Sequence, residues 1–290
     1  MAVDERPAPT APGDGRLRLV RAVAAAEFEL IPLPGAIDRA AALPSGATVT
    51  VTASPARGLD PTLELVEALA GRGFTAVPHL AARSIRDRAH LEDVLDRLDG
   101  AGIRRVFVVG GDGAEPGAFP DGLSLLRAVE DLGHRFGHVG IPGYPQGHAD
   151  IRQDVLLRAM LDKQPFADHV TTQLSFDPRA IERWIAAARG SGVTLPVHVG
   201  LPGPADLVRL LRVTARIGVA GAASYLRKNR GLLGAILHRR AFRPDPLLDG
   251  LAATVADPAS AVRTFHIYTF NQVEEAVRWH ARMLERIRSG

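Results

Sequence analysis

The segment TAVPHLAARSIRDRAHLEDVLDRLDGAGIRRVFVVGG, residues 75–111, contains two short apolar runs separated by an amphipathic stretch. The runs TAVPH (75–79) and RRVFVVGG (104–111) are typical of parallel strands that are buried on both faces. Between them the sequence predicts a helix over 87–99, because its apolar residues recur at helical spacing. These residues are Leu91, Val94, Leu95 and Leu98. The order strand, helix, strand predicts a βαβ unit.

The same alternation of strand and helix recurs along the chain. The predicted strands cover 27–32, 48–54, 75–79, 104–111, 138–144, 168–176, 194–200 and 262–270. The predicted helices cover 36–43, 87–99, 121–132, 150–162, 178–189, 204–213, 220–240 and 246–255, and two more begin at Asp60 and Asn271. Eight strands close a (β/α)₈ TIM barrel, so we expect an α/β fold with one catalytic domain over 21–290. An open, doubly wound sheet is the structural alternative.

Polar residues stand where the predicted strands stop. They are Glu29, Thr52, His79, Asp112, Tyr144, Gln173, His198 and Tyr268. In a barrel of parallel strands the carboxyl ends gather on one face, so residues far apart in the chain become neighbours there. The sequence therefore predicts a pocket on that face.

Composition restricts the class of function. The chain is 46% hydrophobic and 23% charged, has no cysteine and carries a net charge of +3. These values are typical of a globular protein without disulfides or thiolate ligands, and we expect a cytoplasmic location. No apolar run reaches the length of a membrane span, and the few aromatic residues argue against nucleic-acid binding, so a small anionic ligand is favoured. Residues 1–20 lack a signal peptide and are expected to form a disordered N-terminal lead-in.

Two carboxylates are candidates for chemistry. Glu29 interrupts an apolar strand, where burial would raise its pKa and make it a proton donor. A salt bridge at the rim is the structural alternative for Glu29. Asp112 follows Gly110 and Gly111, which would let a flat ligand approach the backbone while Asp112 accepts a hydrogen bond. A tight turn with a cap is the alternative there.

Other candidates follow the third, fifth and sixth strands. His79 could contact a phosphate, the backbone or a substrate, and Tyr144 could stack on a ligand or donate a hydrogen bond to it. His148 could contact a phosphate or cap the next helix. Gln173 offers an amide donor and acceptor to a heterocycle. Asp177 precedes a proline at a helix start and is interpreted as an N-cap.

Histidines near the rim raise a metal hypothesis. His79, His148, His198 and His266 could converge with Asp112. The strand-one HxH pair of many metal-dependent barrel hydrolases and the H-E-x-x-H motif are both absent, so no metal is expected. A metal-dependent barrel hydrolase remains an alternative function. The basic stretch 227–240 is interpreted as a solvated helix face or subunit contact, with phosphate binding as the alternative.

Six motifs in this order resemble the methylenetetrahydrofolate reductase family, over about residues 27–279. FELIPLP (28–34) is similar to the family's FEFFPP, PHLAAR (78–83) to PHLTC, VGGD (109–112) to LRGD, GYPQGH (143–148) to YPEGH, TTQLSFD (171–177) to TQFFFD, and FHIYTFNQ (265–272) to FHFYTLNR. The resemblance implies a barrel enzyme that reduces 5,10-methylenetetrahydrofolate to 5-methyltetrahydrofolate for methionine synthesis. It implies FAD as cofactor and NADH or NADPH as co-substrate.

The resemblance also implies roles for individual residues. Glu29 matches the general acid that assists opening of the folate's five-membered ring, Asp112 the acid near flavin and pterin, and Gln173 the amide that binds the substrate. Gln272 is assigned to the substrate with these three. The implied cofactor-binding residues are Thr52, His79, Gly111, Asp112, Tyr144 and His148.

Four positions depart from the family's motifs. Gly110 replaces an arginine, Ala53 a tyrosine, Gln146 a glutamate and Gln272 an arginine. These departures resemble a divergent branch in which hydride passes directly from the nicotinamide to the folate without flavin. Both routes stay open, as does a non-catalytic folate- or nucleotide-binding protein, and the sequence leaves the oligomeric state open.

Overall fold

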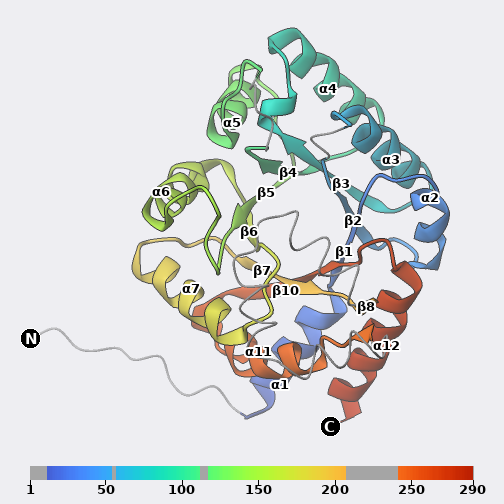
Figure 1. Ribbon diagram of the computed structural model, residues 1–290, viewed down its shortest axis with the longest axis vertical. Helices are drawn as coiled ribbons and strands as arrows, with labels where there is room; N and C mark the ends of the chain where they lie inside the picture. Colours follow the sequence, from blue (N-terminus) through green and yellow to red (C-terminus); the bar gives the residue numbers. More distant parts are fainter. Residues whose placement is uncertain (1–11, 54–56, 112–116, 207–240, 290) are drawn as a thin grey trace, which may run out of the picture.

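The computed structural model describes residues 12–53, 57–111, 117–206 and 241–289 (Figure 1). Eight parallel strands form a closed barrel in the order β1-β10-β7-β6-β5-β4-β3-β2. They are β1 (Glu27–Leu30), β2 (Thr48–Val51), β3 (Thr75–Ala81), β4 (Arg105–Val109), β5 (His138–Gly143), β6 (His169–Thr172), β7 (Val197–Pro202) and β10 (Val262–Tyr268). The predicted TIM barrel is therefore confirmed, and closure excludes the open sheet.

Helices surround the barrel (Figure 1). They are α1 (Pro12–Ala24), α2 (Ala36–Arg39), α3 (Asp60–Gly71), α4 (Arg88–Gly100), α5 (Gly122–Asp131), α6 (Gln153–Lys163), α7 (Pro178–Gly190), α11 (Asp245–Ala256) and α12 (Val273–Ser289). Short 3₁₀ helices are η1 (Ala40–Ala42), η2 (Ala82–Ser84), η3 (Gln164–Phe166) and η4 (Pro258–Ser260). The described residues include no helix with the length and apolar character of a bilayer span.

Aspartate side chains cap the amino ends of several of these helices. The Asp87 carboxylate accepts a hydrogen bond from the His90 backbone at the start of α4. Asp177 does the same for Arg179 at the start of α7, so the predicted N-cap is confirmed. Such caps satisfy backbone N–H groups that have no partner in the first turn, which is why the helix starts are legible in the sequence.

Helix α1 lies against β10, α11 and α12. The Thr264 hydroxyl donates to the Ala22 carbonyl at 3.2 Å, and His280 Nε2 donates to the Val23 carbonyl at 2.7 Å. The sequence predicts a disordered lead-in through residue 20, but the helix begins at Pro12, so the prediction is wrong from that residue on. Its proline, alanine and glycine content conceals a helix whose C-terminal turn, with Ala22 and Val23, is buried in the core.

The segment after β7 also differs from the prediction. Residues expected in a helix over 204–213 include strand β8 (Ala205–Asp206), which pairs antiparallel with β9 (Ala241–Phe242) outside the barrel. The predicted helix over 220–240 and the basic stretch 227–240 lie outside the described residues.

The inside of the barrel is unusually polar. Buried charged or imidazole side chains on its strands are Glu27, Glu29, His79, His169, His198 and His266. Barrel interiors are ordinarily filled by branched apolar residues, so this polar content carries a cost that pairing must offset.

Candidate functional site

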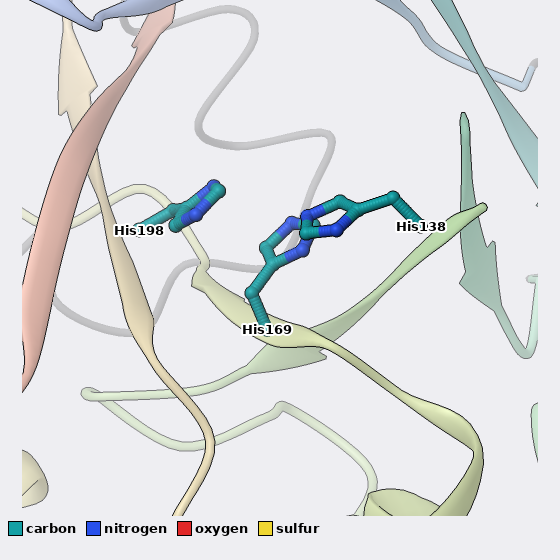
Figure 2. A group of neighbouring side chains, drawn as sticks. All are labelled: His138, His169 and His198. Carbon is teal, nitrogen blue, oxygen red and sulfur yellow. The ribbon is translucent and has the colours of Figure 1, made fainter. Parts of the chain in front are cut away.

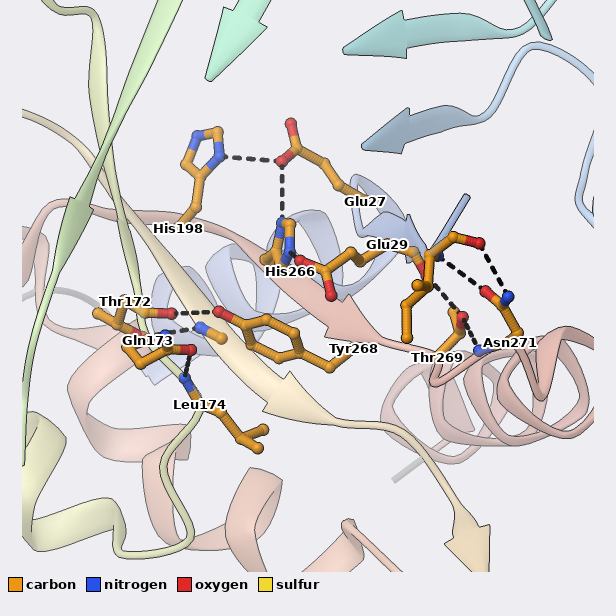
Figure 3. A network of polar contacts seen from close by, with 12 residues as sticks. Glu27, Glu29, Thr172, Gln173, Leu174, His198, His266, Tyr268, Thr269 and Asn271 are labelled. Atoms are coloured by element: carbon orange, nitrogen blue, oxygen red, sulfur yellow. Dashed lines mark hydrogen bonds and ion pairs between the residues drawn. The ribbon is translucent and has the colours of Figure 1, made fainter. Parts of the chain in front are cut away.

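The candidate site lies at the carboxyl ends of the barrel strands, as the sequence predicts. Glu29 is on β1, and strand register places it beside Tyr268 of β10. Glu29 is only 9% exposed. Figure 3 shows its side chain pointing toward His266, which comes from β10.

Glu29 belongs to a buried chain of charged groups (Figure 3). Its Oε2 lies 3.3 Å from His266 Nε2. The other nitrogen of that ring, Nδ1, is 3.8 Å from Glu27 Oε2. The same Glu27 oxygen lies 3.3 Å from His198 Nδ1. Two carboxylates therefore flank one imidazole in the centre of the barrel.

This arrangement decides the charge of His266. Burial lowers the pKa of His266, but the contacts with Glu29 at 3.3 Å and Glu27 at 3.8 Å, together with the charges of both residues, outweigh burial and raise that pKa to about 9. Burial raises the pKa of Glu27, yet the contacts with His198 and His266 and their charges bring it well below its ordinary value. At neutral pH, His266 is therefore a protonated imidazolium and Glu27 is ionised.

The segment after β10 fixes the end of β1. Asn271 Oδ1 accepts from the Ile31 N–H at 2.8 Å, and Asn271 Nδ2 donates to the Ile31 carbonyl at 2.9 Å. The Thr269 hydroxyl donates to the Glu29 carbonyl at 2.5 Å. Asn271 has a φ of 58°, a left-handed conformation that asparagine tolerates better than most residues. The segment after β10 thus holds the backbone on and after Glu29.

Gln173 lies on the neighbouring part of the rim, after β6. Its backbone N–H donates to the Gly143 carbonyl at 2.7 Å, and its Oε1 accepts from the Leu174 N–H at 2.8 Å. The side-chain acceptor is thus used within the protein, which leaves the amide N–H groups to face a ligand. Beside it, the Tyr268 hydroxyl donates to the Thr172 carbonyl at 3.0 Å. Burial, then the charge of Glu29, raises the pKa of Tyr268 well above its ordinary value.

His79 lies inside the barrel near these buried charged residues. Its ring is 4.7 Å from the Phe107 ring and 6.5 Å from the His266 ring, between centroids. Burial, then the charge of His266, lowers the pKa of His79 to about 3, so His79 is neutral. Its Nε2 is buried without a hydrogen-bond partner. A buried ring nitrogen without a partner is available to a ligand at this place.

The remaining candidates lie around this centre. The half-buried Thr52 donates its N–H to the Leu30 carbonyl at 3.0 Å and so continues the pairing of β2 with β1. Gly111 has a φ of 89°, and a Cβ there would lie 3.2 Å from the Ala81 Cβ. The half-buried Gln272 donates its N–H to the Thr269 carbonyl.

Tyr144 and His148 lie in the loop after β5, with their rings edge to face at 5.5 Å. His148 Nδ1 accepts from the Asp150 N–H at 3.1 Å, so it stabilises its own turn. Tyr144 also borders a small, mainly apolar cavity with Met160 and Trp184. That cavity lies between β5, α6 and α7, on the flank of the barrel.

Not every predicted residue joins the site. Asp112 lies outside the described residues. His198 is expected at a strand end, but β7 continues to Pro202, which leaves His198 near the start of the strand. Among the described residues, His79, His148, His198 and His266 do not form one group of possible metal ligands, as the metal hypothesis set aside above would require. A different group, His138, His169 and His198, has its ring nitrogens close together.

Four residues at the site were missed by sequence reasoning. Glu27 precedes Glu29 by two positions, so both point into the barrel, and this period-two spacing was the available signal. Thr269 and Asn271 stand in the quoted FHIYTFNQ motif without an assigned role. Arg83 donates its N–H to the Gly110 carbonyl at 3.0 Å, which places an arginine beside the loop where the family's motif has one and this chain has Gly110.

Comparisons with known proteins bear on this site. The family model for methylenetetrahydrofolate reductase matches residues 32–218. Methylenetetrahydrofolate reductase 1 of Schizosaccharomyces pombe is 25% identical over 122 residues, which are 38% of this chain and 20% of that protein. The match thus spans about a fifth of the curated relative. A phosphonomutase structure from Burkholderia cenocepacia J2315 covers 79% of this chain and 100% of its own, with 16% identity and a TM-score of 0.43, too distant for an inference.

The matched region begins at residue 32, two residues after β1 ends, and includes the strands and loops that carry His79, Gly111, Tyr144 and Gln173, but not Glu29. It includes more than half of the chain. The protein therefore belongs to the methylenetetrahydrofolate reductase family.

Proposed function

We propose that this protein reduces 5,10-methylenetetrahydrofolate to 5-methyltetrahydrofolate with NADH or NADPH, and that Glu29 is the general acid. Family membership supports an oxidoreductase that acts on a folate. The observation that carries the proposal is the buried Glu29 carboxylate at the carboxyl end of β1, paired with His266 and held by Thr269 and Asn271.

Ring opening needs one proton. Protonation of a nitrogen of the folate's five-membered ring breaks the bond from that nitrogen to the methylene carbon, and the remaining iminium carbon accepts hydride. Glu29 is a carboxylate beside the His266 imidazolium in the resting site, so it takes up this proton before ring opening and becomes a carboxylate again when it supplies the proton. The imidazolium, 3.3 Å away, stabilises the carboxylate that forms again, which favours proton donation in this buried place.

Other rim residues position the substrate. The Gln173 amide, whose oxygen is already bonded to Leu174, donates an N–H to the pterin. Gln272, next to Asn271, and Asp112 are proposed to complete the folate site. No titrating group apart from Glu29 has to change protonation, because the electrons come from the nicotinamide.

The family implies FAD, and the residues present fit a planar ring system at this rim. The buried, unpartnered Nε2 of His79 offers a polar contact, and Gly111, with its φ of 89°, turns the backbone just after β4. Thr52, His79, Gly111, Tyr144 and His148 would hold FAD, which would carry two electrons from nicotinamide to folate. The backbone of Arg83 is bonded to that of Gly110, and we propose that its guanidinium binds an anionic part of either nucleotide.

The test is oxidation of reduced nicotinamide by the purified protein, with and without added FAD, in the presence and absence of 5,10-methylenetetrahydrofolate. We expect oxidation that depends on the folate, with Glu64→Gln on an exposed face of α3 as a variant of unchanged activity. Without folate-dependent oxidation in either condition the proposal is wrong. Tight folate binding without turnover would instead identify a binding protein.

A further inference from the structure

A second group of polar side chains lies away from the rim. His138 and His169 are the first residues of β5 and β6, and His198 is the second residue of β7. These are the amino ends of three adjacent strands, at the mouth of the barrel opposite the candidate active site. Figure 2 shows the three imidazoles side by side inside the barrel. One ring nitrogen from each lies within 4.8 Å of the others.

Two of these rings have nitrogens that lack a partner. His169 is 4% exposed, and its Nδ1 is buried without a hydrogen bond. His138 Nε2 is also buried without one. Burial lowers the pKa of His169 to about 2, with a further contribution from His198, and burial lowers that of His138 as well. Neutral imidazoles offer lone pairs, which is the form that binds metal ions.

Carboxylates lie behind two of the three histidines. Glu27 Oε2 is 3.3 Å from His198 Nδ1, and Asp168 Oδ2 is 3.9 Å from His138 Nδ1. At hydrogen-bond distance, the Glu27 carboxylate favours the His198 tautomer with its proton on Nδ1, so that Nε2 can bind a metal. Arg105 lies 3.3 Å from the other carboxylate oxygen of Glu27, so the negative charge of Glu27 is paired with a guanidinium.

The surrounding backbone makes room for the cluster. A Cβ at Gly140 would lie 2.5 Å from His169 Nε2, so this glycine in β5 is required by the position of the ring. The His138 side chain is 31% exposed, which gives an ion and a water ligand a path from the barrel mouth. Three histidines with one open position are a familiar donor set for zinc.

We propose that His138, His169 and His198 bind one divalent transition-metal ion of the zinc class at the amino-terminal mouth of the barrel. The rings are stacked, with centroids 3.8 Å apart for His169 and His198 and 4.7 Å apart for His138 and His169. Binding therefore requires the rings to turn until their lone pairs meet at one point, at about 2.0–2.1 Å from the ion. The ion would link β5, β6 and β7 and keep one coordination position open to water.

The experiment uses the full chain without a histidine tag, dialysed against Zn²⁺ and then against metal-free buffer. We expect about one equivalent of zinc by elemental analysis. Substitution of His169→Gln should weaken zinc binding by at least about tenfold, because a ligand is lost. His90→Gln is the matched control, because His90 is a half-buried histidine on α4 outside the cluster, and it should retain the zinc.

A second measurement does not depend on how the variants fold. One equivalent of Co²⁺ added to the unaltered protein should give the visible absorption of a four-coordinate site, and zinc should abolish it. The proposal is overturned if the unaltered protein gives no such absorption and no stoichiometric zinc. It is also overturned if folded His169→Gln binds zinc as tightly as the unaltered chain. Neither result depends on folate reduction at the other mouth.

Discussion

His266 is held between two acidic residues, Glu27 and Glu29, deep in the barrel. Its pKa of about 9 lies above the ordinary value of 6.5, so the folded protein binds a proton that the unfolded chain releases between these values. The resulting stability is fully present below pH 6.5 and is lost as the pH rises through 9. An imidazole buried at the same place without the two carboxylates would instead be neutral.

We therefore predict that the free energy of unfolding falls by on the order of 3 kcal/mol as the pH rises from 6.5 through 9. Chemical denaturation at a series of pH values measures this slope. In His266→Gln the slope should disappear over the same range. An equal slope in the variant would show that His266 is not the titrating group.

Glu29 is predicted to be required for the chemical step. Glu29→Gln has nearly the same shape but no proton to donate, so folate-dependent oxidation of nicotinamide should fall by about 10²–10⁴-fold. The dissociation constant of reduced nicotinamide should stay within about twofold, as measured by fluorescence titration, because Glu29 is assigned to the folate. If the variant keeps more than a tenth of the activity, another group supplies the proton.

At the scale of single residues the sequence predicts the candidates but not their pairing. Glu29 interrupts an apolar strand and is visible as an exception. The histidine that neutralises it is more than two hundred positions away, and only closure of β10 onto β1 brings them together. The acceptor of Gln173 is used by its own neighbour, which no sequence pattern indicates.

Among the elements, the segment after β10 acts as a clamp on β1. Asn271→Ala removes two hydrogen bonds to Ile31 and leaves buried backbone groups unpaired. We predict a loss of about 1–3 kcal/mol in unfolding free energy, with lower activity because the Glu29 backbone is released. Thr254→Val, which removes a side-chain hydrogen bond to Glu182 between α11 and α7, is the control and should retain activity. Full activity in Asn271→Ala would contradict the clamp.

Gly140 tests how tightly the interior of β5 is packed. An alanine Cβ would lie 2.5 Å from the His169 ring and 2.6 Å from the Phe107 ring. We predict that Gly140→Ala destabilises the protein by about 1–3 kcal/mol, measured by thermal and chemical unfolding. Gly71→Ala, at the end of α3 with nothing within 4 Å, should be neutral. Equal stability of the two variants would show that the side chains around Gly140 can shift to accommodate a methyl group.

Sequence reasoning works best for elements with local signals. Asp177 with Pro178 locates the start of α7 because a cap and a proline act within one turn. Helix α3 also begins at Asp60 with Pro61, but Asp60 is its first residue and makes no side-chain cap, so the N-cap expected of Asp60 is not found. The amino end of β7 and the pairing of β8 with β9 have no such signal, since they depend on partners elsewhere in the chain. For the same reason α1 is not legible, because its buried side depends on β10, α11 and α12.

In the whole molecule, the two ends of the barrel carry different polar groups, and buried polar side chains lie between them. The carboxyl ends of the strands carry Glu29, Gln173 and Tyr268, whereas the amino ends carry the three-histidine cluster. Glu27 contacts groups that belong to both, through His266 and His198. The sequence predicts eight strands and one functional face, since both follow from repetition. It does not predict the second polar mouth, because the depth of a residue in a barrel depends on where its strand begins.

The most direct test of folate reduction is the fate of hydride from nicotinamide that carries deuterium at C4. The protein is incubated with this nucleotide and 5,10-methylenetetrahydrofolate, and the product is measured by mass spectrometry. We predict 5-methyltetrahydrofolate, with deuterium in the methyl group if hydride passes directly and with loss of label to water if FAD carries it. Absence of 5-methyltetrahydrofolate, with and without FAD, would contradict the proposed function.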